Sequence, residues 1–226
     1  LTMISASSFA GGPWVQSKGK SYFKLSEWWL VFDEHYTSAG LKDPNVTTGL
    51  YNTFLYGEYG FTNKFTGIVS SALFSRNYVN NLVSKTTGKT LVAGDAVNYM
   101  GDTDLGLKYQ LSKSGAKVPI ALSLVLGLPI GKSVAGIGKN LQTGDGEFNQ
   151  ILQIDIGKGF SAFKSRQAYY AFSAGFNNRS NGFSQEYRFG GEFGMEFFNQ
   201  KLWLIARVNG IESLKNGDTA ETVTST

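Results

Sequence analysis

The sequence contains no cysteine and only one histidine, His35. Zinc sites are built from Cys, His and acidic ligands, so this composition argues against a zinc protein. The absence of Cys is compatible with a compartment in which free thiols are a liability. Charged residues make up 17% of the chain, below the roughly 25% that is usual in soluble domains. Low charge, 14% aromatic residues and 28 glycines favour strands and turns over helices.

Long hydrophobic runs are also missing. The longest, VPIALSLVLGLPIG at 118–131, is shorter than the about 20 residues of a membrane-spanning helix, and it contains two prolines. No window repeats apolar residues with helical spacing. The net charge is +4, and the Lys and Arg residues are scattered among acids, without the basic stripe that binds nucleic acid. A membrane location would therefore require strands.

Alternation with a period of two is frequent. In 104–111, Leu105, Leu107, Tyr109 and Leu111 alternate with Asp104, Gly106, Lys108 and Gln110. This is the pattern of a strand with one apolar and one polar face. Nine strands are predicted, at 21–32, 51–61, 65–75, 101–111, 118–128, 151–157, 168–176, 187–197 and 201–210. The first, 21–32, is rich in aromatic residues, and its sequence does not define which face is apolar.

The connections between these strands favour one architecture. They are long after the first, third and fifth strands (33–50, 76–103 and 129–149) and shorter after the second, fourth and sixth. Outer-membrane barrels alternate in this way because their periplasmic turns are short and their outer loops long. Strands of about 9 to 11 tilted residues also match the thickness of a bilayer. The sequence therefore predicts an all-β fold, an antiparallel transmembrane β-barrel with nine of about twelve strands visible.

A barrel in a bilayer turns its apolar face outward, and this assigns each face of the strands. The residues predicted to face lipid are Leu105, Leu107, Leu122, Leu124, Ile154, Phe189, Phe193 and Leu204. The residues predicted to line the lumen are Glu58, Asp104, Lys108, Asp155, Arg188, Glu192, Glu196 and Arg207. Both signs of charge occur in the second set. It fits either a polar pore lining or an ion-pair network that fills a closed barrel.

The two ends of the sequence differ from the middle. Residues 1–10 resemble the tail of a secretory signal peptide with a small-x-small site at Ser8-Phe9-Ala10. Residues 11–226 are predicted to form one barrel domain. Because bacterial single-chain barrels have an even number of strands, we expect further strands beyond the ninth.

Five segments carry a family resemblance: GDTDLGLKYQL (101–111), LGLPIGK (126–132), LQTGDGEFNQ (141–150), GFNNRSNGFSQEYRFG (175–190) and KLWLIARVNGIESLKNG (201–217). Together they resemble the outer-membrane proteins grouped as transporters of the MetA pathway of phenol degradation, loosely related to FadL-like channels. The resemblance, from about Gly19 to Gly217, implies an outer-membrane barrel with a transport role and assigns no site residues. FadL-like channels carry a long N-terminal hatch, whereas only 11–20 precede the first strand here.

Three functions follow, in order of preference. The first is a passive channel for a small, hydrophobic or aromatic compound. The protein itself would be exported through the periplasm to the outer membrane of a Gram-negative bacterium. The second is a closed barrel that serves as a structural or accessory subunit. The third is a lipid-modifying enzyme, which the single His35 disfavours, so we expect no catalytic site. The expected partners are lipid and lipopolysaccharide, a small solute and other outer-membrane subunits, without nucleic acid.

We expect no cofactor and no metal. Asp33, Glu34 and His35 are adjacent in sequence, and neighbouring residues of a strand point to opposite sides. Asp145 and Glu147 flank Gly146 as in calcium loops, but the pattern of an EF-hand is incomplete. A tight loop turn is the preferred interpretation of 145–147.

Overall fold

The protein is all-β in the part that the computed structural model describes, residues 12–36, 39–43, 47–163, 166–180, 182–198 and 201–214. These residues contain no helix long and apolar enough to cross a membrane. The predicted signal-peptide remnant at 1–10 lies outside the described residues, and so does the chain after Leu214.

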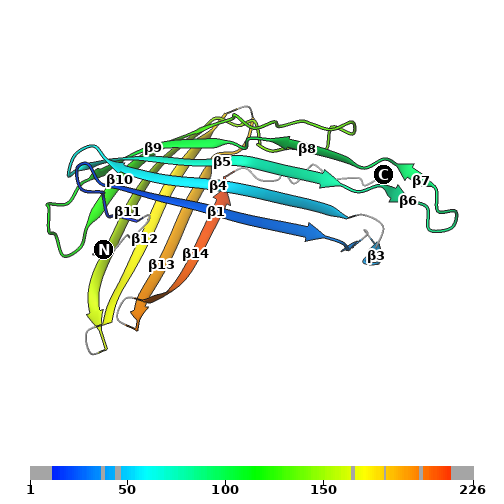
Figure 1. Ribbon diagram of the computed structural model, residues 1–226. Coiled ribbons are helices and arrows are strands. Elements are labelled where there is room, and N and C mark those ends of the chain that lie inside the picture. The colour runs from blue at the N-terminus through cyan, green and yellow to red at the C-terminus, as the bar shows by residue number, and fades with distance from the viewer. Residues whose placement is uncertain are drawn as a thin grey trace.

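The described strands form one large antiparallel sheet (Figure 1). Its path in order is β1 (Ser21–Phe32), β4 (Thr48–Gly60), β5 (Phe65–Val79), β9 (Thr103–Gln110), β10 (Ile120–Leu128), β11 (Asn149–Ala162), β12 (Arg166–Arg179), β13 (Glu186–Phe197) and β14 (Leu202–Ser213). Each strand pairs with its neighbour in the chain, so the sheet is a simple meander. All nine predicted strands are confirmed, and several are longer than the sequence pattern indicated.

Short strands that the sequence pattern did not reveal lie in the connections. β8 (Asp95–Tyr99) is a tenth strand of the sheet and pairs with the end of β5. β2 (His35–Tyr36) pairs with β3 (Lys42–Asp43), and β6 (Leu82–Val83) pairs with β7 (Thr90–Val92). These strands have two to five residues, which is too few for a period of two to stand out.

The connections alternate between the two ends of the sheet, and the three longest lie at the same end. We call one the short-turn end, where the connections are 61–64, 111–119, 163–165 and 198–201. The other is the long-loop end, where they are 33–47, 80–102, 129–148 and 180–185. In Figure 1 the extended hairpin of β6 and β7 lies at the far right and the turns of the short-turn end lie at the left. The alternation predicted for the connections after the first six strands is thereby confirmed, whereas 180–185 at the long-loop end is shorter than 111–119 at the short-turn end.

The sheet curls into a half-barrel without closing (Figure 1). Among the described residues, β1 pairs only with β4, and β14 pairs only with β13. The all-β, antiparallel architecture agrees with the prediction. The predicted closed barrel of about twelve strands is not what the described part shows: the edges of β1 and β14 are both free of a strand partner there.

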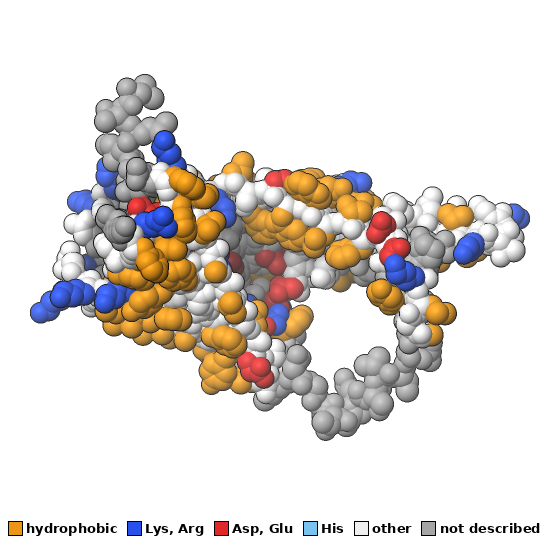
Figure 2. Space-filling view, turned by 90° about the horizontal axis from the view of Figure 1, so that it is seen from below, with side chains coloured by type: hydrophobic (Ala, Val, Ile, Leu, Met, Phe, Trp, Pro, Cys, Tyr) orange, Lys and Arg blue, Asp and Glu red, His pale blue; other side chains and the backbone are white. Residues whose placement is uncertain are grey.

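Burial is inverted relative to an ordinary globular domain. The largest side chains that are almost completely buried are Glu58, Glu147, Asn177, Thr66, Asp155, Pro13 and Ser75. Large apolar side chains are exposed instead, among them Leu124 at 50% and Phe189 at 56%. Figure 2 shows apolar side chains over the outer wall and acidic side chains inside the hollow. The concave face is therefore polar and the convex face apolar.

Candidate functional site

The eight charged residues predicted to line a lumen lie on five strands of the sheet. Glu58 is on β4, Asp104 and Lys108 are on β9, Asp155 is on β11, Arg188, Glu192 and Glu196 are on β13, and Arg207 is on β14. Glu58, Lys108, Asp155 and Glu196 are buried. Asp104, Arg188 and Glu192 are half-buried, and Arg207 is exposed on the edge strand. The structure pairs four of the eight with one another, as Glu58 with Lys108 and Glu192 with Arg207.

The residues predicted to face lipid lie on the alternate positions. Leu105, Leu107, Leu124, Ile154, Phe189, Phe193 and Leu204 are exposed, and Leu122 is half-buried. Leu124 pairs with Leu107 on one side and with Leu152 on the other, so an apolar row crosses three strands.

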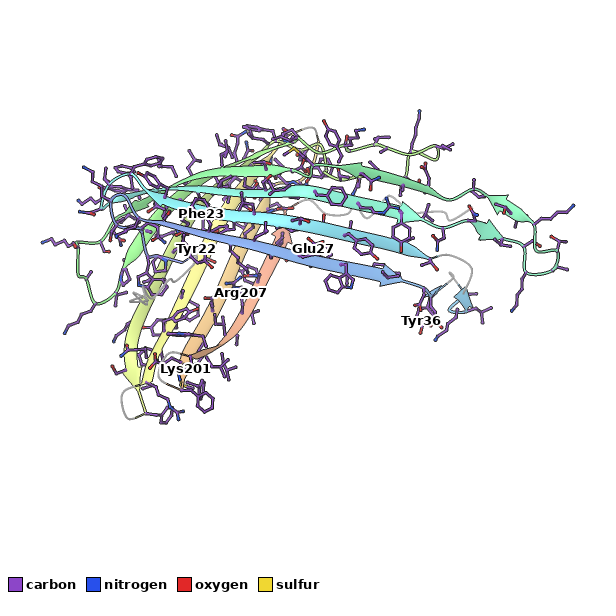
Figure 3. All side chains as sticks on the ribbon, in the orientation of Figure 1. Tyr22, Phe23, Glu27, Tyr36, Lys201 and Arg207 are labelled. Carbon is purple, nitrogen blue, oxygen red and sulfur yellow. The ribbon has the colours of Figure 1, made fainter. Side chains whose placement is uncertain are left out.

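One charged side chain interrupts the apolar face of β1. Glu27 is exposed there, and the hydroxyl of Thr53 on β4 donates a 2.5 Å hydrogen bond to its carboxylate (Figure 3). The sequence did not define the phase of this strand. The register with β4 defines it: Glu27 pairs with Thr53. On the other face of β1, Tyr22 pairs with Glu58 and Lys24 pairs with Tyr56.

Glu58 is the centre of a buried polar network. Its carboxylate lies 3.5 Å from the ammonium group of Lys108, and both side chains are almost fully enclosed. The hydroxyl of Tyr56 donates a 2.5 Å hydrogen bond to Oε1 of Glu58, and Nε2 of Gln16 donates a 2.7 Å bond to Oε2. A buried carboxylate needs such partners because its desolvation is costly.

Asp155 lies on β11, on the same concave face. It is 2% exposed, and Nε2 of Gln153, two positions earlier on the strand, donates a 2.8 Å hydrogen bond to its carboxylate. Its pairing partners are the small residues Ala121 on β10 and Ser173 on β12. Small neighbours leave space around this carboxylate, and the space forms part of the cavity described below.

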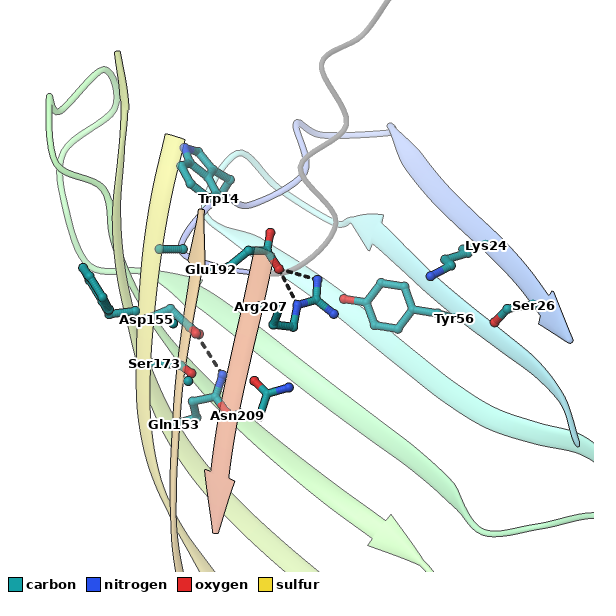
Figure 4. Close-up of a pocket in the computed structure, with 15 residues that line it drawn as sticks. Trp14, Lys24, Ser26, Tyr56, Gln153, Asp155, Ser173, Glu192, Arg207 and Asn209 are labelled. Carbon is teal, nitrogen blue, oxygen red and sulfur yellow. Dashed lines mark hydrogen bonds and ion pairs between the residues drawn. The ribbon is translucent and has the colours of Figure 1, made fainter. Parts of the chain in front are cut away.

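A second ion pair joins the last two strands. The Nε of Arg207 donates a 2.5 Å hydrogen bond to Oε2 of Glu192, and a second guanidinium nitrogen contacts the same oxygen (Figure 4). The hydroxyl of Tyr169 on β12 donates to the other carboxylate oxygen of Glu192. Glu192 and Arg207 are direct cross-strand partners, so the register itself brings them together.

The segment before β1 enters the concave side at the short-turn end. Trp14 packs edge-on against Tyr169 of β12, with ring centroids 5.5 Å apart. Gln16 then lies against the opposite wall of the curled sheet, where its backbone N–H donates a 2.8 Å hydrogen bond to Oγ1 of Thr66 on β5. The backbone oxygen of Ser17 approaches Gly60 so closely that a Cβ there would lie 2.2 Å from it. Residues 12–20 therefore connect β12 with β4 and β5 across the interior.

A cavity of about 400 Å³ remains between this segment and the sheet (Figure 4). Aromatic rings of Trp14 and Tyr56, the ion pair of Glu192 with Arg207, and Asp155 contribute to its walls. Lys24 of β1 lines it from the opposite side. Such a volume lies within the range of small-molecule sites, and the mixed walls offer ring surfaces and fixed charges of both signs.

A further polar cluster lies at the long-loop end. Arg179 at the end of β12 contacts Glu186 at the start of β13 at 2.7 Å and Asp145 of the loop 129–148 at 3.4 Å. Asn177 donates hydrogen bonds to Asn149 and Glu186. The cluster ties the loop to the wall of the sheet.

The calcium interpretation of 145–147 receives no support from the described residues. They contain no group of three His, Cys, Asp or Glu side chains that could hold a metal ion. Oδ1 of Asp145 instead accepts the backbone N–H of Glu147 at 2.8 Å, which is the turn preferred from the sequence. His35 lies in β2, paired with Asp43, and its side chain is outside the described part.

Several contributors to the site were missed by the sequence pattern. Tyr56 shares the face of Glu58 two positions away, and this spacing could have identified it. Trp14 and Gln16 lie in no strand, so no periodicity could place them. Arg179 and Glu186 flank a connection, where alternation stops.

Comparison with known proteins found no match, neither to a protein-family model nor to a curated protein. No family is therefore identified for the chain.

Proposed function

We propose that the protein is an outer-membrane β-barrel that lets a small compound pass through a narrow, polar lumen without covalent chemistry. The location would be the outer membrane of a Gram-negative bacterium, reached through the periplasm, with the short-turn end facing the periplasm. The family resemblance of the sequence supports the same proposal. Its partners would be the surrounding lipid and lipopolysaccharide, the solute, and further outer-membrane subunits.

The observation that carries the proposal is the inversion of burial. Glu58 and Asp155 are buried on the concave face while Leu124, Phe189 and Leu204 are exposed on the convex one. In water, exposing a wall of large apolar side chains is unfavourable, and patches beyond a few hundred Å² mark interaction surfaces. In hydrocarbon the same wall is favourable, and strands satisfy their backbone groups by pairing with one another.

Passage, rather than a merely structural role, is supported by the cavity of about 400 Å³. Trp14 and Tyr56 supply aromatic walls for an uncharged ring compound, and Glu192 with Arg207 supplies a fixed polar edge. The small residues Ala171 and Ser173, which also line the cavity, keep it open on the β12 side.

Conductance in planar bilayers tests this function. We expect the purified full-length protein to form channels of small conductance, and Trp14→Ala to increase the conductance because it removes a ring from the cavity. Trp29→Ala is the matched control, since Trp29 is 62% exposed. A membrane-inserted protein with no channel activity and no solute flux in either form would contradict passage.

A second candidate is the closed barrel with a structural or accessory role. It is favoured by the crossing of residues 12–20 and by the Glu58 network, both of which fill the interior. In this case the Trp14→Ala variant would show no channel conductance in planar bilayers, and the protein would be recovered with other outer-membrane subunits.

A further inference from the structure

Basic side chains gather at the short-turn end of the sheet. Exposed cations at this end are Lys18, Lys20, Lys64, Lys113, Lys117, Arg166 and Lys201, which we call the basic rim. They are scattered along the sequence, but each lies in a connection at this end or directly beside one. Figure 2 shows Lys and Arg side chains projecting from this end of the molecule, at the left, and Figure 3 places Lys201 at the turn before β14.

Acidic residues are absent from the same connections. The sequences 12–20, 61–64, 111–119, 163–165 and 198–201 contain no Asp or Glu. The carboxylates on the strands nearest to the rim, Glu58 and Glu196, are buried on the concave side. The long-loop end is different, because Asp33, Glu34 and Asp145 lie there among Lys85 and other cations. The exposed charges of the short-turn end are therefore all positive, whereas those of the long-loop end are of both signs.

Exposed aromatic side chains accompany the basic rim. They are Phe61, Phe65, Phe163 and Phe198, which are 54%, 38%, 79% and 74% exposed. Phe65 contacts Tyr109 with ring centroids 4.7 Å apart, and the guanidinium of Arg166 lies 4.8 Å from the ring centroid of Phe197. Aromatic rings beside cations are typical of the interface between a bilayer and water. There the rings lie at the headgroup level and Lys or Arg reaches lipid phosphates.

We propose that the basic rim binds the headgroups of anionic phospholipids in the monolayer that it contacts. The proposal rests on the proposed function, because it assumes that the convex face is in a bilayer. A lipid accounts for both features, since its phosphate is complementary to the lysines and its acyl chains are complementary to Leu111, Val118 and the exposed phenylalanines. An acidic polypeptide in the periplasm would account for the charge alone.

Competition between two lipids of equal chain length tests the proposal. The folded full-length protein in an uncharged detergent is titrated with phosphatidylglycerol and, separately, with phosphatidylcholine, and native mass spectrometry measures bound lipid. We expect a preference for phosphatidylglycerol that falls as salt is raised. The triple variant Lys64→Gln/Lys113→Gln/Lys117→Gln is expected to lose about fivefold in affinity per lysine.

The matched control is Lys85→Gln/Lys89→Gln/Lys139→Gln, which removes equal charge from the long-loop end. It should keep the affinity of the unmodified protein. Equal binding of both lipids by the unmodified protein, or equal loss in both triple variants, would overturn the proposal. So would tighter binding of polyglutamate than of phosphatidylglycerol.

Failure of this proposal is distinguishable from failure of the proposed function. A protein that inserts and conducts but has no lipid preference contradicts the basic rim alone. A protein that binds phosphatidylglycerol vesicles while its strands stay open to added protease contradicts membrane insertion.

Discussion

The ammonium group of Lys108 on β9 lies 3.5 Å from the carboxylate of Glu58 on β4, although β5 separates the two strands. On β5, Thr66 pairs with Lys108 and Ile68 pairs with Glu58, so the contact crosses the strand at these two residues. The two long side chains thus meet above the middle strand. The pair holds three strands together from the inside of the curled sheet.

Removing one partner of this pair should destabilise the fold strongly. Lys108→Ala leaves the carboxylate of Glu58 buried with only neutral donors, Tyr56 and Gln16. We expect the free energy of unfolding to fall by about 3 kcal/mol, as for other broken buried pairs. Urea unfolding in phospholipid vesicles measures it.

The double variant Glu58→Gln/Lys108→Gln is the control for this prediction. It removes both charges and keeps groups that can hydrogen-bond, so it should lie much closer to the unmodified protein. A single variant as stable as the double one would show that the charge of Glu58 is already hydrated on the concave face.

Gly194 and Tyr169 form a second cross-strand relationship with a testable consequence. A Cβ at Gly194 would lie 2.2 Å from Cε1 of Tyr169, whose ring covers the glycine. Gly194→Ala should therefore cost about 1–3 kcal/mol in the free energy of unfolding, because the ring must move within a packed interior. Gly159→Ala is the control, since its Cβ would meet only a backbone oxygen, at 4.0 Å. Equal effects in both variants would contradict the role of the ring.

The strands could be predicted because each carries its own evidence in the sequence. In β10, Leu122, Leu124 and Leu126 alternate with Ala121 and Ser123. Because successive side chains of a strand point to opposite faces, this alternation assigns the leucines to one face and the small residues to the other. The alternation of long and short connections then favoured an antiparallel barrel architecture. The same reasoning placed Glu58 and Lys108 on one face.

The contacts between distant segments could not be predicted in the same way. Gln16 lies in an irregular segment without periodicity, and its contact with Glu58 depends on the curvature of the whole sheet. The register of β4 against β5 shifts at Thr53, an irregularity that no pattern of residue types defines. The basic rim was missed because its lysines are distant in sequence and meet only when the strands pair.

Leu124 lies in the middle of the apolar face, between Leu107 and Leu152 on the neighbouring strands. If this face contacts hydrocarbon, Leu124→Arg should lower the free energy of unfolding in vesicles by about 2–4 kcal/mol. Gln153→Arg, on the concave face of β11, should change it by less, because that face meets water or ion pairs. A larger loss in the free energy of unfolding for Gln153→Arg than for Leu124→Arg would mean that the convex face contacts water rather than hydrocarbon.

If the protein is the channel proposed above, the ion pair of Glu192 with Arg207 should set its ion selectivity. Both line the cavity, and Arg207 is the more exposed partner. Arg207→Gln leaves the carboxylate of Glu192 uncompensated, so we expect the reversal potential under a salt gradient to shift toward cation selectivity. Glu192→Gln should shift it in the opposite direction, and the exchange Glu192→Arg/Arg207→Glu should restore it toward the original value. The control is Arg166→Gln at the short-turn end, outside the cavity: a shift there as large as that of Arg207→Gln would place the selective charge at the rim rather than beside Glu192.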